Sequence, residues 1–268
     1  MEEASSTPVA LSATLLLRLR AARRVMVLTG AGISAESGLA TFRDAQTGSW
    51  SRFNPQDLAS RDGFARDPRR VWAWYALRRQ TIAGATPNPG HSALARLQDI
   101  YPSVAIVTQN IDGLHARAGS RDVIELHGNI TRFRCFEEDV PVEYDEPEPG
   151  DDISLSDDDR ATWPEVPRCG HCGGMLRPDV VWFGEALPVA AWYQAEESAR
   201  ACDLCLVVGT SAVVYPAAAL PMMARDAGAL LVEVNPEPTE LTSSVDLSLR
   251  GPAGVMLPWL VEQIAPTK

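Results

Sequence analysis

The chain has 268 residues, of which 46% are hydrophobic and 22% charged, a composition typical of a globular protein. Its formal net charge of −11 lies in residues 137–160, which hold twelve acidic residues and one arginine, so the remainder is neutral. A nucleic-acid-binding surface is therefore not expected, because no basic excess can displace counterions, and no apolar run reaches the roughly 20 residues that span a membrane.

The amino-terminal residues, MEEASSTPVA, are acidic and lack the basic and then apolar layout of a secretory signal. Four of the five cysteines form two C-x-x-C pairs, which are more typical of metal ligands or buried thiols than of a secreted disulfide framework. Of these, Cys202 and Cys205 adjoin an apolar run and are expected to be buried structural thiols. We therefore expect a cytoplasmic protein.

Helical and strand patterns alternate along most of the chain. Leucines at helical spacing in residues 11–24 predict a helix, and the short apolar run VMVLT (25–29) after it predicts a buried strand. Further strands are predicted at 104–109, 122–126, 204–210 and 230–234, and further helical segments at 91–101 and 254–264. Apolar strands that alternate with helices indicate an α/β fold whose parallel sheet is covered on both faces.

Two stretches interrupt this alternation. Residues 44–87 are rich in aromatic residues and arginine and have a helical pattern, whereas residues 131–177 contain three cysteines and the acidic run 137–160. The acidic run has three prolines and few apolar residues, which is typical of a solvated loop. We interpret the two stretches as insertions that build a smaller domain beside a main domain of residues 1–43, 88–130 and 178–268.

Glycines and polar residues follow the predicted strands. GAGISAESG (30–38) follows the first strand, where glycines let the backbone approach a ligand and amides at the start of a helix favour phosphate. The motifs at the other strand ends are TQNIDGLH (108–115), ELHGNI (125–130), GTS (209–211) and VNPEP (234–238). Because ligands of open α/β sheets collect at the carboxyl ends of the strands, this pattern predicts a crevice for a large polar ligand.

These motifs resemble those of the sirtuins, the NAD-dependent protein lysine deacylases. GAGISAESG, TFR, TQNIDGLH, ELHG, the C-x-x-C before VVWFGE, VVGTS and VEVN occur in the sirtuin order. The resemblance implies a Rossmann-like, doubly wound NAD-binding domain with a smaller inserted domain, made of a zinc-ribbon-like module and a helical module. It also implies that acyl-lysine proteins or peptides are the substrates, and that nicotinamide and O-acyl-ADP-ribose are released. The high content of alanine and arginine indicates a bacterial source.

The resemblance assigns roles to residues of these motifs. His127 of ELHG matches the general base that deprotonates a ribose hydroxyl, a role that suits imidazole because its unperturbed pKa is about 6.5. Asn110 and Asp112 match the other catalytic positions. The residues that match NAD contacts are Gly30, Ala31, Gly32, Thr41, Phe42, Arg43, Trp50, Gln109, Asn110, Ile111, Asp112, Gly209, Thr210, Ser211, Asn235, Pro236, Glu237 and Ala253. Those that match the segment pairing with the substrate backbone are Val181, Phe183, Gly184 and Glu185.

Tyr75 and Arg78 lie three residues apart in WAWYALRR (72–79), so they share one face of the predicted helix. In an isolated Y-x-x-R the arginine would usually snorkel beside a core aromatic residue. However, the desuccinylase and demalonylase branch of the sirtuins (class III) carries such a pair, with alanine at the pocket opening, for which Ala59 is the candidate. Because a buried carboxylate must be paired, the resemblance implies removal of succinyl, malonyl or glutaryl groups from lysine.

The zinc module departs from the sirtuin pattern. Sirtuins usually bind zinc through two cysteine pairs, but here Cys135 is followed three residues later by Glu138 in place of the expected cysteine, while Cys169 and Cys172 form the second pair. Glu138 or His171 could supply the fourth ligand, since carboxylate and imidazole can replace a thiolate. Loss of the metal is the alternative, because oxygen beside three thiolates binds zinc less well.

Other functions remain open on these residues alone. A sirtuin with an ordinary apolar acyl pocket would be a deacetylase, and the same chemistry at the ribose carbon would serve an NAD hydrolase or an ADP-ribosyltransferase. The VVWFGE segment and the pair of Tyr75 and Arg78 argue against pure hydrolysis. A non-catalytic NAD sensor would not need Asn110, Asp112 and His127, and a dehydrogenase would require the full G-x-G-x-x-G fingerprint.

Overall fold

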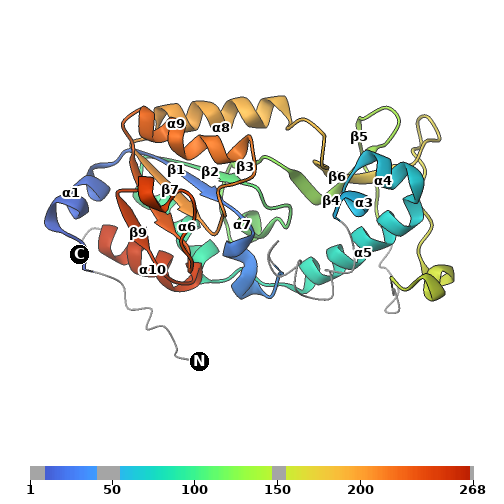
Figure 1. Cartoon of the computed structure of the whole chain (residues 1–268), viewed down its shortest axis with the longest axis horizontal. Coiled ribbons are helices and arrows are strands. Elements are labelled where there is room, and N and C mark those ends of the chain that lie inside the picture. The colour runs from blue at the N-terminus through green and yellow to red at the C-terminus, as the bar shows by residue number, and fades with distance from the viewer. Residues whose placement is uncertain (1–9, 41–54, 147–154, 266–268) are drawn as a thin grey trace.

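A six-stranded parallel sheet forms the centre of the larger part of the protein (Figure 1). The computed structural model describes residues 10–40, 55–146 and 155–265. The strands lie in the order β3-β2-β1-β7-β8-β9, and every pairing in this sheet is parallel. Their bounds are β1 Arg24–Thr29, β2 Ser103–Thr108, β3 Val123–Glu125, β7 Leu204–Val208, β8 Leu230–Val234 and β9 Leu247–Leu249. The predicted α/β fold with a Rossmann-like parallel sheet is thus confirmed.

Helices cover both faces of this sheet. One face packs against α1 (Ala13–Ala21), α6 (Pro89–Ile100) and α10 (Ala253–Ile264), and the other packs against α8 (Val189–Ala201) and α9 (Leu220–Asp226). The larger part is therefore a three-layered structure, with its apolar sheet between two layers of helices (Figure 1).

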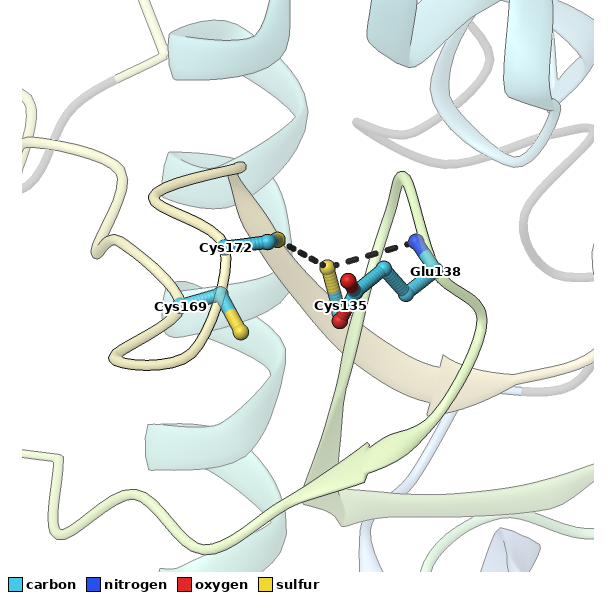
Figure 2. A group of neighbouring side chains, drawn as sticks. All are labelled: Cys135, Glu138, Cys169 and Cys172. Atoms are coloured by element: carbon cyan, nitrogen blue, oxygen red, sulfur yellow. Dashed lines mark hydrogen bonds between the residues drawn. The ribbon is translucent and has the colours of Figure 1, made fainter.

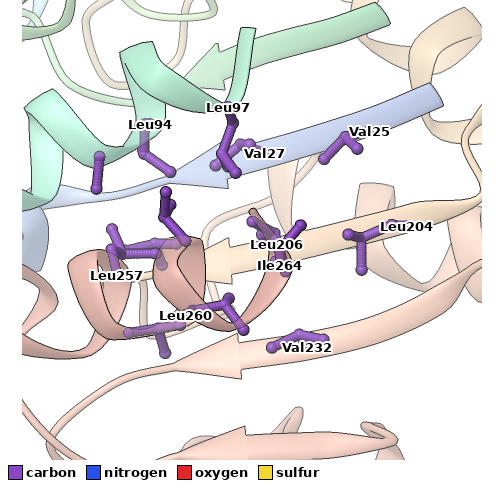
Figure 3. Packing of buried hydrophobic residues seen from close by; sticks show 14 of the residues in the cluster. Val25, Val27, Leu94, Leu97, Leu204, Leu206, Val232, Leu257, Leu260 and Ile264 are labelled. Atoms are coloured by element: carbon purple, nitrogen blue, oxygen red, sulfur yellow. The ribbon is translucent and has the colours of Figure 1, made fainter. Parts of the chain in front are cut away.

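The alternation of side chains along the strands explains why the strand sequences are apolar at every position. Val25 and Val27 of β1 join the core on the side of α6 and α10, whereas Met26 and Leu28 join the core on the side of α8 and α9. Figure 3 shows the first of these cores, in which side chains of α6 and α10 meet those of the strands. A strand that is buried on both faces has no position for an exposed polar side chain.

In the described part of the chain, a three-stranded antiparallel sheet and the helices α3, α4 and α5 build the smaller part, at the end of the molecule opposite α1 (Figure 1). β4 (Gly128–Cys135) pairs with both β5 (Pro141–Val142) and β6 (Leu176–Val180). The helices are α3 Pro55–Leu58, α4 Arg61–Arg66 and α5 Pro68–Gly84. Only Leu126 and His127 separate the last residue of β3 from the first residue of β4, so His127 lies at the junction of the two sheets.

The helix α5 contains the WAWYALRR segment and is buried on more than one side. Asp67 caps it by accepting a hydrogen bond from the Arg70 amide at 3.3 Å, and Pro68 occupies its first turn, where no amide hydrogen is needed. Trp72 packs in a cluster with residues of the small sheet, and Tyr75 packs in a second cluster with residues of α4 and of the segment after β6. α5 therefore buries apolar side chains on more than one of its faces, unlike a surface helix with one apolar and one polar face.

Shorter helical pieces connect these elements. The glycine-rich segment after β1 forms the 3-10 helix η1 (Ala31–Ser37) rather than an α-helix, and it ends at Gly38, whose φ of 82° favours glycine. The other short helices are α7 Leu114–Arg117, η3 Asp157–Thr162, η4 Ala217–Ala219 and η5 Thr242–Ser244. In the described part of the chain, no helix combines the length and the apolar character that a bilayer span requires.

The two cysteines at the start of β7, Cys202 just before the strand and Cys205 within it, are structural, as expected. Cys202 and Cys205 are both buried in the core on the side of α8 and α9, and both are free thiols. Burial raises the pKa of Cys202 to about 11 and also raises that of Cys205. Neither thiol is therefore a nucleophile at neutral pH.

Candidate active site

The strand order of the large sheet reverses between β1 and β7. Open α/β sheets bind their ligands beside such a reversal, at the carboxyl ends of the strands. The loops after β1 and β7 pack directly on each other there. Gly30 donates its amide hydrogen to the Val208 oxygen at 3.0 Å, and Gly32 donates to the Gly209 oxygen at 2.8 Å. A Cβ atom on Gly32 would lie 2.7 Å from the Gly209 oxygen. These glycines are thus required for the contact between two backbone segments, irrespective of any ligand.

Asn110 and Asp112 belong to one hydrogen-bonded group with Ser34 of η1. The Ser34 hydroxyl donates to Asp112 Oδ2 at 2.8 Å and accepts from Asn110 Nδ2 at 3.2 Å. Asn110 Nδ2 also donates to the Gly30 oxygen at 3.2 Å, and Asp112 Oδ1 accepts from the Leu114 amide at 2.9 Å. All three side chains are buried. The two predicted catalytic residues, Asn110 and Asp112, therefore lie together, and both are hydrogen-bonded to Ser34. The position of Ser34 in the glycine-rich motif gives no sign of this role.

His127 has one ring nitrogen bound within the protein and one left to accept a proton. Its Nδ1 lies 2.9 Å from the backbone oxygen of Gln109, and since a carbonyl oxygen can only accept, Nδ1 carries the hydrogen. Burial lowers the pKa of His127, and the hydrogen bond to Gln109 offsets this only in part. At neutral pH the imidazole is therefore uncharged, with the lone pair on Nε2.

The other buried histidines are not placed as bases. The rings of His91 and His115 lie 5.0 Å apart, and burial lowers the pKa of both, that of His115 to about 3. His115 Nε2 is 2.9 Å from the Thr29 hydroxyl, which donates to the Thr108 hydroxyl at 2.8 Å, and this in turn accepts from the Asn110 amide at 3.0 Å. His115 is therefore the start of a neutral hydrogen-bonded chain that supports the backbone at Asn110.

Residues predicted for the rest of the NAD site lie along the ends of β2, β7 and β8. Gln109 Nε2 donates to the Thr210 hydroxyl at 3.0 Å, and Asn235 Nδ2 donates to the Thr210 backbone oxygen at 3.0 Å. Ser211, Pro236 and Glu237 are exposed beside them, Ala31 and Ile111 are half-buried, and Ala253 is buried at the start of α10. Thr41, Phe42, Arg43 and Trp50 lie outside the described residues. Polar groups at neighbouring strand ends suit the pyrophosphate and ribose groups of a dinucleotide.

Tyr75 and Arg78 are close enough on α5 to interact, as their spacing predicts, and Tyr75 is buried whereas Arg78 is half-buried. The Tyr75 hydroxyl accepts a hydrogen bond from Trp182 Nε1 at 2.9 Å, and the Arg78 guanidinium lies 4.7 Å from the centre of the Trp74 ring. Burial raises the pKa of Tyr75 and lowers that of Arg78, while the charge of Asp112 acts to raise the latter. Arg78 is therefore close enough to the Asp112 group for their charges to interact.

The adjacent arginine, Arg79, is used differently. It is buried, it forms an ion pair with Glu146, and its guanidinium lies 4.9 Å from the centre of the Trp72 ring. In the described part of the chain, by contrast, no carboxylate forms an ion pair with Arg78. Consecutive residues on a helix point about a hundred degrees apart, which explains why Arg79 reaches Glu146 and Arg78 does not.

The segment after β6 lies between the two parts of the protein. Val181 donates its amide hydrogen to the His127 oxygen at 2.9 Å, and Phe183 donates to the Ala59 oxygen at 2.8 Å. The Phe183 side chain and Gly184 are exposed. Because these two amide hydrogens are already used, a substrate peptide paired here would use other backbone groups of the segment.

Glu185, at the end of this segment, stabilises the turn in which it lies. Its carboxylate accepts from Arg177 Nη2 at 2.8 Å and from the Trp182 amide at 2.8 Å. Burial alone would raise the pKa of Glu185, but the hydrogen bond and charge of Arg177 keep it below its ordinary value. The side chain of Glu185 is therefore a structural element of the turn.

Three cysteines and one glutamate meet at one end of the small sheet (Figure 2). One potential ligand atom from each of Cys135, Glu138, Cys169 and Cys172 lies within 4.8 Å of all the others. The sulfur atoms of Cys135 and Cys172 are 3.4 Å apart. Zinc about 2.3 Å from each sulfur requires donors roughly 3.8 Å apart, so the arrangement fits a single tetrahedral ion.

The geometry distinguishes the two candidates for the fourth ligand. His171 is outside the cluster and its side chain is 83% exposed, but its Nδ1 lies 2.9 Å from Glu138 Oε2. Backbone amides of Cys172 and His171 lower the pKa of Cys169, which favours the thiolate that a metal needs. Among the described residues, Glu138 is thus the donor that completes the set, with His171 as its hydrogen-bonding partner.

Protein purified without a chelator is expected to contain about one zinc ion per chain, and a chelator should lower its melting temperature. Glu138→Cys should raise zinc affinity because a thiolate is a softer ligand, whereas Glu138→Ala should lower it. Metal analysis and thermal melting with and without chelator measure both effects. A zinc content near zero in the wild type would mean that protein contacts alone hold β4 and β6 together at this end.

Comparison with known proteins gives one consistent result. A family model described as the Sir2 family matches residues 30–216. An NAD-dependent protein deacylase of Ralstonia nicotianae is 53% identical to this chain over 240 residues, which cover 90% of this chain and 92% of that protein.

Solved structures that resemble this chain are also Sir2 homologues. A Sir2 homologue in complex with NAD has a TM-score of 0.84 and 41% identity, covering 95% of this chain and 94% of that one. Sir2Af2, solved with a myristoylated histone peptide, has a TM-score of 0.70 and 38% identity, covering 93% of this chain and 94% of that one. These similarities extend over both parts of the protein.

Proposed function

Because this chain belongs to the Sir2 family and is an NAD-dependent protein deacylase, we propose that it removes acidic acyl groups, succinyl or malonyl, from lysine. Its partners would be proteins or peptides that carry these groups. A neighbour that binds a myristoylated histone peptide supports an acylated peptide as the substrate class, but the chemistry of the acyl group has to come from the pocket of this chain.

The observation that carries the proposal is that, among the described residues, no carboxylate forms an ion pair with the guanidinium of Arg78. Arg78 is half-buried, and a cation that is partly removed from water is stabilised when a carboxylate enters directly beside it. Tyr75 adds a hydroxyl on the same helix face, and its oxygen already accepts a hydrogen from Trp182, so its own hydrogen is available to a ligand. An acetyl group offers no negative charge to either residue. The two side chains therefore favour an acyl chain that ends in a carboxylate.

The catalytic group supports deacylation by the same site. NAD would supply the electrophilic ribose carbon, and we assign to His127 Nε2 the acceptance of a proton from a ribose hydroxyl. The Nδ1 hydrogen bond to Gln109 holds the ring in the required tautomer. Asn110 and Asp112, fixed by Ser34, would orient the nicotinamide and ribose end of NAD.

The proposal predicts that a peptide with succinyl-lysine is deacylated at least a hundredfold more efficiently, in kcat/KM, than the same peptide with acetyl-lysine. The reason is that only the succinyl group brings a carboxylate to Arg78. A matched control is the succinyl analogue whose terminal carboxylate is replaced by a carboxamide, which has the same shape without the charge. All reactions are run with and without NAD.

The results of this assay distinguish an acidic acyl deacylase from a deacetylase and from an NAD hydrolase. Acetyl-lysine or the carboxamide ahead of succinyl-lysine would exclude an acidic acyl preference and leave a deacetylase. Nicotinamide release that is the same with every peptide and without any peptide would indicate an NAD hydrolase instead.

A further inference from the structure

The hydroxyl of Tyr75 is hydrogen-bonded to a tryptophan that is distant in the sequence. Trp182 Nε1 donates to the Tyr75 oxygen at 2.9 Å, and the centres of the two rings are 6.4 Å apart. Both side chains are only 2% exposed. The bond therefore joins α5 to the segment after β6 in the protein interior.

Trp182 is held in turn by two charged residues. The Arg177 guanidinium lies 3.5 Å from the centre of the indole ring, and it forms an ion pair with Glu185, which also accepts from the Trp182 amide. Arg177 is completely buried. The indole is thus fixed on its face by a cation and at its backbone by a carboxylate.

The direction of this bond determines what the Tyr75 hydroxyl can do. An indole N–H can only donate, so the Tyr75 oxygen must accept, and the one hydrogen of the hydroxyl can be donated only to an acceptor other than Trp182. A hydroxyl that accepts a hydrogen bond also becomes a better donor, because hydrogen bonds in a chain polarise one another. The Arg177 cation over the indole face adds to the polarisation of the N–H group.

We propose that Trp182, clamped by Arg177 and Glu185, is a positioning residue that fixes the Tyr75 hydroxyl as a donor to the carboxylate of the acyl group. This inference rests on the proposed acidic acyl preference. It goes beyond that preference because it places part of the selectivity in a residue that the substrate does not need to touch. Without Trp182, the Tyr75 hydroxyl would be free to rotate, and its hydrogen would no longer be directed to the ligand.

The test is a double-mutant cycle with Trp182→Phe, Tyr75→Phe and the double variant. For each, the ratio of kcat/KM for succinyl-lysine to that for acetyl-lysine is measured on the same peptide. Tyr75→Phe should lower the ratio about ten- to a hundredfold, since a bond to a charged acceptor is lost. Trp182→Phe should lower it about three- to tenfold, and should lower it no further once Tyr75 is phenylalanine.

Two outcomes would overturn the inference while the proposed function stands: a ratio unchanged by Trp182→Phe, or the same fall with and without the Tyr75 hydroxyl. If the wild type itself does not prefer succinyl-lysine, the proposed function fails instead.

A spectroscopic measurement keeps the test decisive if Trp182→Phe does not fold. The indole N–H signals of the wild type and of Tyr75→Phe are compared by NMR, before and after addition of either the succinyl-lysine or the acetyl-lysine peptide. One signal protected from solvent exchange should move upfield in Tyr75→Phe, because its acceptor is removed. In the wild type it should respond to succinyl-lysine more than to acetyl-lysine. Protected indole signals that are the same in both proteins would refute the bond, and with it the inference.

Discussion

Replacement of His127 with tyrosine is expected to lower deacylation at least a hundredfold while the protein still folds and binds NAD. The imidazole is the side chain at this site whose free nitrogen can accept a proton near neutral pH, and general bases contribute about a hundredfold or more to rates. A phenol has a pKa near 10 and is protonated at neutral pH. Steady-state kinetics with an acylated peptide measures the loss.

The pH dependence of the wild type provides a second check on His127. Because burial lowers its pKa, the neutral base persists below the ordinary histidine range. Activity as kcat/KM should rise with pH along an acidic limb whose midpoint is below about 6.5, and it should be near its plateau at pH 7.

Thermal melting and NAD binding of His127→Tyr serve as controls for its fold. A folded variant with full activity would remove His127 from the mechanism.

Replacement of Arg78 with methionine is expected to lower desuccinylation at least a hundredfold and to leave deacetylation equal or increased. The variant keeps an apolar chain of similar length, but a succinyl carboxylate would then be buried without its cation, and such a loss costs about 3–5 kcal/mol. Deacetylation does not need the charge, and an apolar pocket suits the acetyl methyl group. Paired rates on succinyl-lysine and acetyl-lysine peptides provide the measurement.

The neighbouring arginine supplies a matched control. Arg79 is paired with Glu146 inside the small part of the protein. Arg79→Lys keeps the positive charge and should change the melting temperature without changing the ratio of desuccinylation to deacetylation. If Arg78→Met and Arg79→Lys altered that ratio equally, selectivity would reflect the stability of α5 rather than a charge in the pocket.

The fold was largely predictable because its strands are buried on both faces. Such strands read as unbroken apolar runs, and the core in Figure 3 is made of residues from those runs and from the predicted helices. The order of the strands was not predictable from the runs, since parallel strands of similar composition are interchangeable in sequence. Likewise, the glycines after β1 have an evident place in a motif, but only the structure shows that Gly32 packs on Gly209.

At the site, the short-range relations were predictable and the long-range ones were not. The shared face of Tyr75 and Arg78 follows from helix geometry alone. The bond from Trp182 to Tyr75 joins residues 107 positions apart, and no spacing rule connects them. The same holds for Ser34 with Asp112, and for Glu138 with His171, where the sequence left two candidate ligands open and the structure places one of them in the cluster.

The ion pair between Arg79 and Glu146 fixes one point of the acidic run to α5. Glu146 is anchored on one side of residues 147–154, and on the other side Arg160 bonds to Asp67 at 2.7 Å and Arg69 bonds to the Trp163 oxygen at 3.1 Å. Both flanks are therefore fastened to α5 or to its capping residue Asp67, each through its own contacts. A reporter or a foreign epitope spliced between the two flanks is accordingly expected to leave these contacts, and with them both sheets, in place.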